Sequence, residues 1–482
     1  MSLSSNALTL RALFGIDNDQ VITGVSCDSR EIKPNMIFAA LPGTLVDGRD
    51  FIGSAIDNGA AAILTTHGTA ADVPVIHSAE PRLDYAYLAK VFFPKQPETL
   101  VAMTGTNGKS STVEFLRQIW AHAGLKAACF GTLGVTSHIG YRPLTHTTPD
   151  ALSLHQTLHD LANAGVTHVA MEASSHGLDQ YRLDAINVSA AGFSNLTQDH
   201  FDYHPDMSDY FAAKARLFTD ITPEGAPVII NTNDEYGRKL VNICEGRGQE
   251  VMQVGWSGEH IRIDELMPHG ASQILTLIVM GERHKIELPL AGEFQALNAV
   301  AALGLALNTG VSLEGALGGL KTLKGVSGRM ERAGQTKDGA PIFVDFAHTE
   351  DGLDKLLRGL RPHIMGKLVI VFGCGGDRDP DKRAKMGAMA TRLADDVIVT
   401  DDNPRTEDAA SIRQAVMQGC RGASNVADRA EAIALGISRL GPSDGLVIAG
   451  KGHEQGQIIG NKVIPFNDVD EVHKVLQAEK YV

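Results

Sequence analysis

The residues best suited to chemistry lie between positions 100 and 120. There an apolar run ends in a loop that holds Gly105 and Gly108, and Lys109 and Ser110 open a segment with helical periodicity. Small residues let backbone N–H groups approach an anion closely, and a helix N-terminus adds unpaired donors and a partial positive charge. The order strand, glycine loop, helix therefore predicts a phosphate-binding loop. The lysine would reach the terminal phosphates, and the serine hydroxyl would ligate magnesium.

One position departs from the full phosphate-loop pattern, because Met103 stands where the first glycine belongs. The alternative is a glycine-rich turn followed by an ordinary helix cap. Gly-Lys-Ser directly after an apolar strand favours the phosphate loop over this alternative. We therefore expect this part of the chain to bind a nucleoside triphosphate.

Further polar residues follow the next predicted strands. Glu172 ends a buried-strand pattern at 167–171. Ligands bind at the carboxyl ends of strands in an open parallel sheet, and a carboxylate there can hold the metal that bridges nucleotide phosphates. The alternative is a solvated glutamate at the end of a strand, and the nearby phosphate loop makes that alternative less favourable.

Four other features keep two interpretations each. The run of acids and imidazoles at 195–204 suits a metal site or a polar loop, and taken alone it favours the loop. Lys214 lies in a helix predicted over 207–218, where a lone lysine is typically solvated. Asn298 is either an amide that contacts a base or a plain helix residue. Ser29, in a turn after a strand predicted at 21–25, taken alone indicates a solvated turn.

The last third of the chain contains four predicted strands that each end in a polar or glycine-rich loop. Asp377-Arg378, Asp402–Arg405 and His453-Glu454 follow three of them. Arginine suits a carboxylate, and glutamate suits an ammonium group. These loops together predict a site for a zwitterionic ligand.

The fold predicted to position these residues is α/β. At 482 residues the chain is too long for one core and suggests about three domains. We predict a small N-terminal α/β domain at 1–97. A central domain at 98–327 would have a phosphate-loop-type, mostly parallel sheet with helices on both faces. A Rossmann-like doubly wound domain would follow at 328–482.

Bulk composition narrows the class of function. Hydrophobic residues make up 43% and charged residues 21%, which is ordinary for a globular protein. The formal net charge of −14 argues against non-specific binding to nucleic acid or to an anionic membrane. The five cysteines are scattered without metal-ligand spacing. With no visible signal peptide or transmembrane run, we expect a cytoplasmic protein, and a monomer.

Five segments, in this order along the chain, resemble the Mur ligases, the ATP-dependent amide-bond-forming enzymes of peptidoglycan precursor synthesis. The segments are Gly-Thr-Asn-Gly-Lys-Ser at 105–110, Met-Glu-Ala-Ser-Ser-His-Gly at 171–177, Asp-His-Phe-Asp-Tyr-His at 199–204, Gly-Arg-Met-Glu at 328–331 and Val-Asp-Phe-Ala-His-Thr at 344–349. Asp-Asn-Pro-Arg at 402–405 is similar to the segment of the family member that adds meso-diaminopimelate to UDP-N-acetylmuramoyl-L-alanyl-D-glutamate. Lysine-adding relatives lack its arginine.

The resemblance implies site residues for each substrate. For ATP they are Gly105, Thr106, Asn107, Gly108, Lys109, Ser110, Ser111, Asn298, Arg329, Asp345 and His348. For the UDP-muramoyl-dipeptide they are Cys27, Ser29, Thr44, Leu45, Val46, Thr147, Thr148, Ser174, Gln180 and Arg182. For diaminopimelate they are Arg378, Asp402, Asn403, Pro404, Arg405, Gly450 and Glu454.

The resemblance also implies a catalytic set, formed by Lys109, Glu172, His200 and Lys214. Magnesium would be held by Ser110, Glu172, His200 and Lys214, the lysine having become a carbamate by reaction with carbon dioxide. Only the resemblance reverses the solvated interpretation of Lys214. The implied reaction forms an acyl phosphate on the D-glutamyl side chain, which the amine of diaminopimelate then attacks.

Two groups of alternatives stay open at the level of sequence. A lysine-adding Mur ligase or a folylpolyglutamate synthetase-like ligase would share the phosphate loop. A phosphate-loop kinase or a nucleotide-switched binding protein would share it without ligase activity, but would leave the clustered C-terminal loops unexplained.

Overall fold

The computed structural model describes residues 8–43, 46–144, 146–201 and 203–478. Contacts divide the chain into two compact units, and each is described by itself. One unit comprises Met1–Lys109, Gly124–Ile230 and Asp234–Val251, and the other comprises Ser110–Ala123, Asn231–Asn233 and Met252–Val482. In the described part of the chain, no helix is both long enough and apolar enough to span a bilayer.

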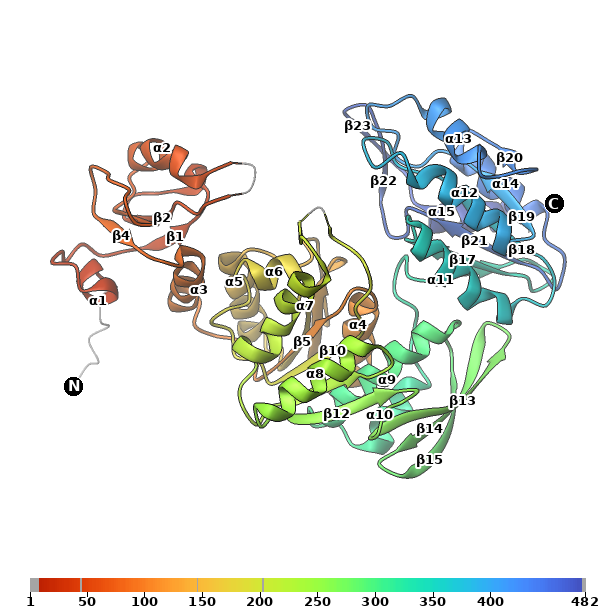
Figure 1. Cartoon of the computed structure of the whole chain (residues 1–482), viewed down its shortest axis with the longest axis horizontal. Helices are drawn as coiled ribbons and strands as arrows, with labels where there is room; N and C mark the ends of the chain where they lie inside the picture. The colour runs from red at the N-terminus through yellow and green to blue at the C-terminus, as the bar shows by residue number, and fades with distance from the viewer. Residues whose placement is uncertain (1–7, 44–45, 145, 202, 479–482) are drawn as a thin grey trace. The chain divides into compact units, whose positions relative to one another are not determined.

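The N-terminal sheet has four parallel strands in sequence order. They are β1 (Gly24–Ser26), β2 (Met36–Ala39), β3 (Ala62–Thr65) and β4 (Val75–His77), after a short helix α1 (Leu10–Phe14). Side chains alternate between the two faces of a strand. Phe38 and Ile63 therefore pack with α2 (Ile52–Asp57), while Ile37 and Leu64 pack with α3 (Pro81–Phe92). Figure 1 shows these two helices beside the strands. The strand expected at 21–25 starts later, at Gly24.

The first unit also contains seven strands in the order β11-β10-β5-β9-β6-β7-β8. Their bounds are β5 (Thr99–Thr104), β6 (Ala127–Gly131), β7 (Gly134–Ser137), β8 (Gly140–Arg142), β9 (His168–Glu172), β10 (Ala190–Phe193) and β11 (Pro227–Asn231). The strands from β11 to β6 are parallel, and β7 and β8 continue antiparallel. The predicted mostly parallel sheet is confirmed, with β5 in its interior.

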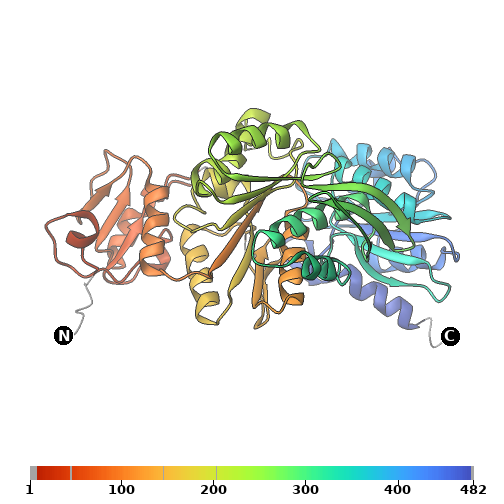
Figure 2. The ribbon, with the colours of Figure 1, turned by 90° about the horizontal axis from the view of Figure 1, so that it is seen from below.

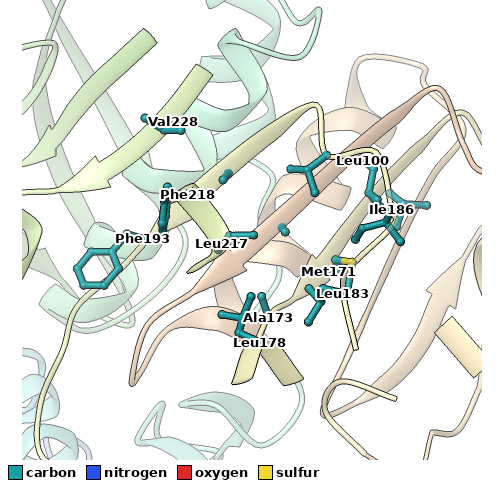
Figure 3. Close-up of a cluster of buried hydrophobic side chains, with 14 of the residues drawn as sticks. Leu100, Met171, Ala173, Leu178, Leu183, Ile186, Phe193, Leu217, Phe218 and Val228 are labelled. Carbon is teal, nitrogen blue, oxygen red and sulfur yellow. The ribbon is translucent and has the colours of Figure 1, made fainter. Parts of the chain in front are cut away.

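The strands in the middle of this sheet are apolar along their length because both of their faces are covered. The helices of the unit that follow α1–α3 are α5 (Ala151–Asn163), α6 (Ser175–Asp179), α7 (Met207–Arg216) and α8 (Glu235–Gly246). Figure 3 shows Leu100, Met171 and Phe193 of the sheet in one buried cluster with Leu178 and Phe218. This packing fixes the strand ends from which the site residues project.

The helix expected over 207–218 ends earlier than predicted. α7 stops at Arg216 and is followed by a π-helical turn, Leu217–Ile221. At the end of this turn the Thr222 hydroxyl donates to the Leu217 carbonyl at 2.7 Å. The wider turn was not visible in the sequence, because the apolar spacing continues through it.

The second unit begins with helix α4 (Lys109–His122), whose Trp120 indole donates to the Thr309 hydroxyl at 2.9 Å. β13 (Ile261–His269), β14 (Ser272–Val279) and β15 (Glu282–Leu288) form an antiparallel meander, visible as long green strands in Figure 2, and β12 (Glu250–Gly255) pairs parallel with β13. Helices α9 (Glu293–Leu307) and α10 (Leu313–Leu320) follow. Asn298 thus lies in α9, which starts at Glu293.

The C-terminal sheet has the order β16-β17-β21-β18-β19-β20. Its strands are β16 (Glu331–Gln335), β17 (Pro341–Asp345), β18 (Leu368–Phe372), β19 (Asp396–Val399), β20 (Ser424–Asn425) and β21 (Gly445–Ala449), and a separate hairpin joins β22 (Gly456–Ile459) to β23 (Lys462–Pro465). Only β16, at one edge, is antiparallel among these six strands. All four predicted strands are present.

Helices cover both faces of this sheet, as expected of a doubly wound domain (Figure 1). α11 (Glu350–Leu360), α12 (Lys382–Leu393) and α13 (Ala409–Met417) pack on one face, and α14 (Arg429–Ser438) and α15 (Asp468–Ala478) pack on the other. The domain boundaries at 97/98 and 327/328 stay a prediction.

Candidate active site

The phosphate loop leaves the carboxyl end of β5 and requires glycine where it turns. Gly105 has φ +143°, and a Cβ placed there would lie 1.9 Å from the Ser194 hydroxyl oxygen. Gly108 has φ +89°, which is also in the region that favours glycine. A side chain at Gly105 or Gly108 would therefore strain the turn.

Lys109 opens α4, and its ammonium folds back over the loop. Its Nζ donates to the carbonyls of Gly105 and Thr106, each at 2.9 Å. Ser110 and Ser111 are buried in the first turn of the helix. The predicted loop residues thus share one strand–loop–helix element.

The segment after β10 supports this loop, and the sequence did not reveal that role. Asn195 accepts from the backbone N–H groups of Thr106 (its carbonyl, 2.8 Å) and Asn107 (its side-chain oxygen, 3.1 Å). The Thr106 hydroxyl donates to the Thr197 carbonyl at 3.1 Å and accepts from the Thr197 N–H at 3.0 Å. Residues 195–197 therefore hold the loop in shape, a role that spacing along the chain could not indicate.

Glu172 ends β9 and is 2% exposed. Its Oε1 accepts from the Thr132 N–H at 2.8 Å, and a Cβ on Gly131 would lie 2.0 Å from that oxygen. The solvated alternative for this glutamate is wrong, because the side chain is held in a fitted, buried position. Such a carboxylate is a hard oxygen donor of the kind that magnesium prefers.

Lys214 is also buried, at 1% exposure, so the solvated interpretation of this lysine is wrong as well. Its Nζ donates to the Gly105 carbonyl at 2.9 Å and lies 4.5 Å from the centre of the Tyr210 ring. Burial, together with the charge of Lys109, lowers the pKa of Lys214 well below its usual range. Deprotonation of this amine is consequently easier than for a solvated lysine.

The histidine rings of the segment at 199–204 cluster with the ring of His176, and the segment leads into the cap of α7. The ring of His176 lies 5.0 Å from that of His200 and 5.8 Å from that of His204. His204 is buried, and its Nδ1 is 2.7 Å from the Asp209 carboxylate. His200 is more exposed and adopts φ +56°. In the described residues no three His, Cys, Asp or Glu side chains converge on a metal position.

The donors present still suit magnesium bound together with nucleotide phosphates. Magnesium keeps water and phosphate ligands and is usually held by only one or two protein carboxylates. Glu172 and the Ser110 hydroxyl supply hard oxygen donors of that kind. A convergent protein cage is therefore not needed for this ion.

The residues expected to meet the muramoyl-dipeptide are linked by hydrogen bonds. Arg182 donates to the Thr148 carbonyl and to the Gln180 side-chain oxygen, each at 2.8 Å. The Ser174 N–H donates to the Thr148 hydroxyl at 3.0 Å, and the Thr147 hydroxyl lies 3.0 Å from that of Thr132. Thr148, Ser174, Gln180 and Arg182 thus form one connected polar group, and Thr147 joins it through Thr132 and Glu172.

The remaining predicted residues of this substrate lie in the N-terminal domain. Ser29 is buried at the start of a 3₁₀ turn capped by Asp28, so it is not solvated. Cys27 is exposed and directly follows β1. Val46 is exposed, and Thr44 and Leu45 lie outside the described residues.

Four residues expected near the nucleotide base and ribose gather in the second unit. Gln295 links two of them, because its amide donates to the Arg329 carbonyl at 2.9 Å and its oxygen accepts from Asn298 at 3.3 Å. The Asp345 carboxylate accepts from the Met330 and Ala347 N–H groups, and burial raises its pKa. Burial lowers the pKa of His348, whose Nδ1 lies 2.8 Å from the Phe346 carbonyl.

The predicted amino-acid site is built from three loops at the carboxyl edge of the C-terminal sheet. The loops pack backbone against backbone, since a Cβ on Gly376 would lie 2.0 Å from the Pro404 carbonyl oxygen and one on Gly450 would lie 2.6 Å from Asp402 Oδ2. Arg405 Nη1 donates to the Gly376 carbonyl at 2.6 Å, and Arg378 is exposed. The three loops expected to act together are thus in direct contact.

Asn403 and Glu454 join two of these loops through a side-chain hydrogen bond of 2.8 Å. Lys451, which the sequence did not single out, contacts both of these side chains. No signal in the sequence marks this lysine, because it lies beside a glycine in a loop where a lysine is normally solvated.

The fold and these sites define a class of protein: an α/β enzyme with a phosphate loop for a nucleotide and a separate polar site for a zwitterion. Residues 21–104 match the description Mur ligase family, catalytic domain; residues 103–306 match the Mur ligase middle domain; and residues 328–452 match the Mur ligase, glutamate ligase domain. The chain belongs to the Mur ligase family.

Two curated relatives and one solved structure are similar over nearly the whole chain, and all three are named UDP-N-acetylmuramoyl-L-alanyl-D-glutamate–2,6-diaminopimelate ligase. The relative from Agrobacterium fabrum is 48% identical over 94% of this chain and 93% of its own. The relative from Brucella melitensis is 46% identical over 99% of each chain. The solved structure is 32% identical, with a TM-score of 0.75, covering 99% of this chain and 100% of that one.

Proposed function

We infer that this protein is an ATP-dependent ligase that joins meso-diaminopimelate to the D-glutamyl side-chain carboxylate of UDP-N-acetylmuramoyl-L-alanyl-D-glutamate, in peptidoglycan precursor synthesis. The observation that carries this inference is the 46–48% identity, over at least 94% of the chain, to relatives that bear this name. A kinase or nucleotide switch would not account for the loops of the C-terminal sheet. Because the reaction consumes ATP and a nucleotide-linked precursor, we place it in the cytoplasm, and we propose a monomer.

The first half-reaction transfers the γ-phosphoryl group of ATP to the glutamyl carboxylate, which gives an acyl phosphate. Enzymes assist such a transfer mainly by positioning and charge neutralisation. We assign this work to the phosphate loop, with Lys109 on the terminal phosphates. Ser110, Glu172, His200 and carbamylated Lys214 would hold magnesium, which when bound neutralises developing charge on the phosphates.

In the second half-reaction the amine of diaminopimelate attacks the acyl carbonyl and phosphate leaves. We propose that Arg378 and Arg405 bind the carboxylate at the far end of diaminopimelate and that Glu454 binds the ammonium group there. Lysine has no carboxylate at that end. The arginines therefore favour a diaminopimelate-adding enzyme over a lysine-adding one.

The proposed carbamate follows from the state of Lys214. An uncharged amine attacks carbon dioxide, an N–C bond forms as one C–O π bond opens, and one proton is released, which turns a neutral amine into an anionic carbamate. Because burial lowers its pKa, Lys214 loses its proton more readily than a solvated lysine does. Labelling with ¹³C-bicarbonate is expected to give a carbamate signal by ¹³C NMR that is absent in Lys214→Ala, and the lack of that signal in the unaltered enzyme would contradict the assignment.

The reaction itself is tested with the purified protein, ATP, magnesium and the UDP-dipeptide. Phosphate release and product mass are measured with meso-diaminopimelate, with lysine, or without an amine. The proposal predicts full turnover and the diaminopimelate adduct only in the first case. Equal phosphate release in all three cases would indicate an ATPase or a switch, and preferred addition of lysine would indicate the other type of ligase.

A further inference from the structure

Lys451 follows β21 and has a completely buried side chain (0% exposed). Its ammonium makes three hydrogen bonds: to Glu454 Oε2 at 2.7 Å, to Asn403 Oδ1 at 3.0 Å and to the Gly456 carbonyl at 2.7 Å. An ammonium group has three protons, so each proton has an acceptor. Lysine is almost never fully buried unless it is paired, so these three acceptors are what allow the Lys451 ammonium to be buried in the loop.

These bonds fix the orientation of the Asn403 amide. Its Oδ1 accepts from Lys451 and also from the Ile458 N–H at 2.9 Å. The amide nitrogen must therefore point the other way, and it donates to Glu454 Oε2 at 2.8 Å. A flipped amide would place its NH₂ group against two donors, so Lys451 and Ile458 together select one orientation.

The same bonds orient the Glu454 carboxylate. Oε2 accepts from both Lys451 and Asn403, whereas Oε1 makes no hydrogen bond within the part of the chain that the structure describes. The Glu454 side chain is 33% exposed although its partner lysine is fully buried. One carboxylate oxygen is thus anchored inward, and the other is presented outward to a ligand.

We propose that Lys451 is a positioning residue for the amino-acid substrate. By anchoring Glu454 and Asn403 it sets the enzyme's preference for an amine that carries an ammonium group beside its far carboxylate. This inference rests on the proposed function. Without Lys451 the Glu454 carboxylate keeps only a neutral donor, and its outward oxygen is no longer held in place.

The experiment compares two substrates of the full-length enzyme. One is meso-diaminopimelate, and the other is 2-aminoheptanedioate, which keeps both carboxylates and the attacking amine but lacks the far ammonium group. Lys451→Met is expected to lower kcat/KM for diaminopimelate about 10- to 100-fold, the range of one charge-assisted hydrogen bond, mainly through KM. The kcat/KM for the analogue and the KM for ATP should change less than about threefold.

A matched control is available in the same domain. Lys474 and Glu471 are also three residues apart, with Nζ 2.6 Å from Oε1, but this pair is on the surface. Lys474→Met should leave the kinetics of both substrates unchanged. A fall that is equal for the two substrates in Lys451→Met would overturn the proposal, since a purely structural role affects both alike.

Two further variants keep the test decisive if Lys451→Met folds poorly. Glu454→Gln retains the shape but loses the charge, and it should reduce the preference for diaminopimelate over the analogue to a similar extent. The double variant should be no worse than either single one, because both changes interrupt the same interaction. An unchanged preference in Glu454→Gln, or multiplicative losses in the double variant, would reject the assignment. Failure of the unaltered enzyme to add diaminopimelate at all would instead reject the proposed function.

Discussion

A buried ion pair in the C-terminal domain holds two loops of the predicted amino-acid site. Its removal gives a quantitative prediction for the stability of that domain. Arg429 and Asp468, the first residues of α14 and α15, are each 0% exposed and share hydrogen bonds of 2.7 and 2.8 Å. Arg429 also donates to the carbonyls of Asp401 at 3.4 Å and Ala449 at 3.1 Å. These two carbonyls directly precede the loops that carry Asp402–Arg405 and Gly450.

Arg429→Met leaves the Asp468 carboxylate buried without its partner. Breaking such a pair typically costs about 3–5 kcal/mol. Replacing both residues, as Arg429→Met with Asp468→Leu, should recover most of this loss, because no lone charge remains. A deficit of about 1–3 kcal/mol should persist, because the Ala449 carbonyl still lacks its donor.

Hydrogen exchange measured by mass spectrometry is the suitable assay, because a chain of several domains does not unfold in one step. Opening free energies are compared for peptides from α14 and β21, with peptides from β2 and β3 as an internal reference. Arg439→Met is the matched control. Its paired contacts with Asp396, both at 3.0 Å, are about one-third exposed, so its cost should stay below about 1 kcal/mol. A loss below about 1 kcal/mol in Arg429→Met would refute the reasoning.

Three further outcomes are expected. Lys109→Ala should reduce turnover by at least about 10³-fold because it removes the charge over the phosphates. Lys126→Ala, at an exposed position, should leave turnover unchanged. Near-normal amide formation by Lys109→Ala would contradict the ATP assignment. Arg405→Ala should raise the KM for diaminopimelate about 10- to 100-fold and leave the KM for ATP nearly unchanged. If steady-state kinetics showed equal rises in both KM values, Arg405 would not be a residue that selects diaminopimelate. Burial lowers the pKa of His155 to about 4, so the folded protein binds this proton less readily than the unfolded chain. Stability should therefore be complete above pH 6.5 and fall as the pH drops toward 4, by about 2 kcal/mol at pH 5 from this residue. Hydrogen exchange of α5 should show that loss, and His155→Leu should abolish it; an equal loss in the variant would assign it to other groups.

The sequence predicted the features that depend on neighbours along the chain. The strand, loop and helix around Gly105–Lys109 and the four apolar strands of the C-terminal sheet are each specified within a few residues. Lys214 and Lys451 could not be predicted in this way. Their burial is produced by segments distant in sequence, such as the Gly105 carbonyl for the first and Asn403 for the second. The support that Asn195 gives the phosphate loop likewise depends on the pairing of β10 with β5.

For Lys214, the resemblance to a family reversed the interpretation that its own position in the sequence favoured. Helical spacing alone favours a solvated lysine. The similarity of the surrounding segments to one family indicated instead a lysine of the metal site, and the structure places its Nζ against the loop predicted to hold the phosphates. Its chemical modification stays a prediction until the carbamate is observed.

The close packing of the three loops has a consequence for redesigning which amine the enzyme accepts. Gly376 and Gly450 leave no room for a side chain beside Pro404 and Asp402, so a library that varies these glycines would mostly yield misfolded clones. Variation at the exposed Arg378 leaves the backbone frame intact, whereas Arg405 also donates to the Gly376 carbonyl and so helps to hold two loops together. New acceptor specificities should therefore be sought first at Arg378.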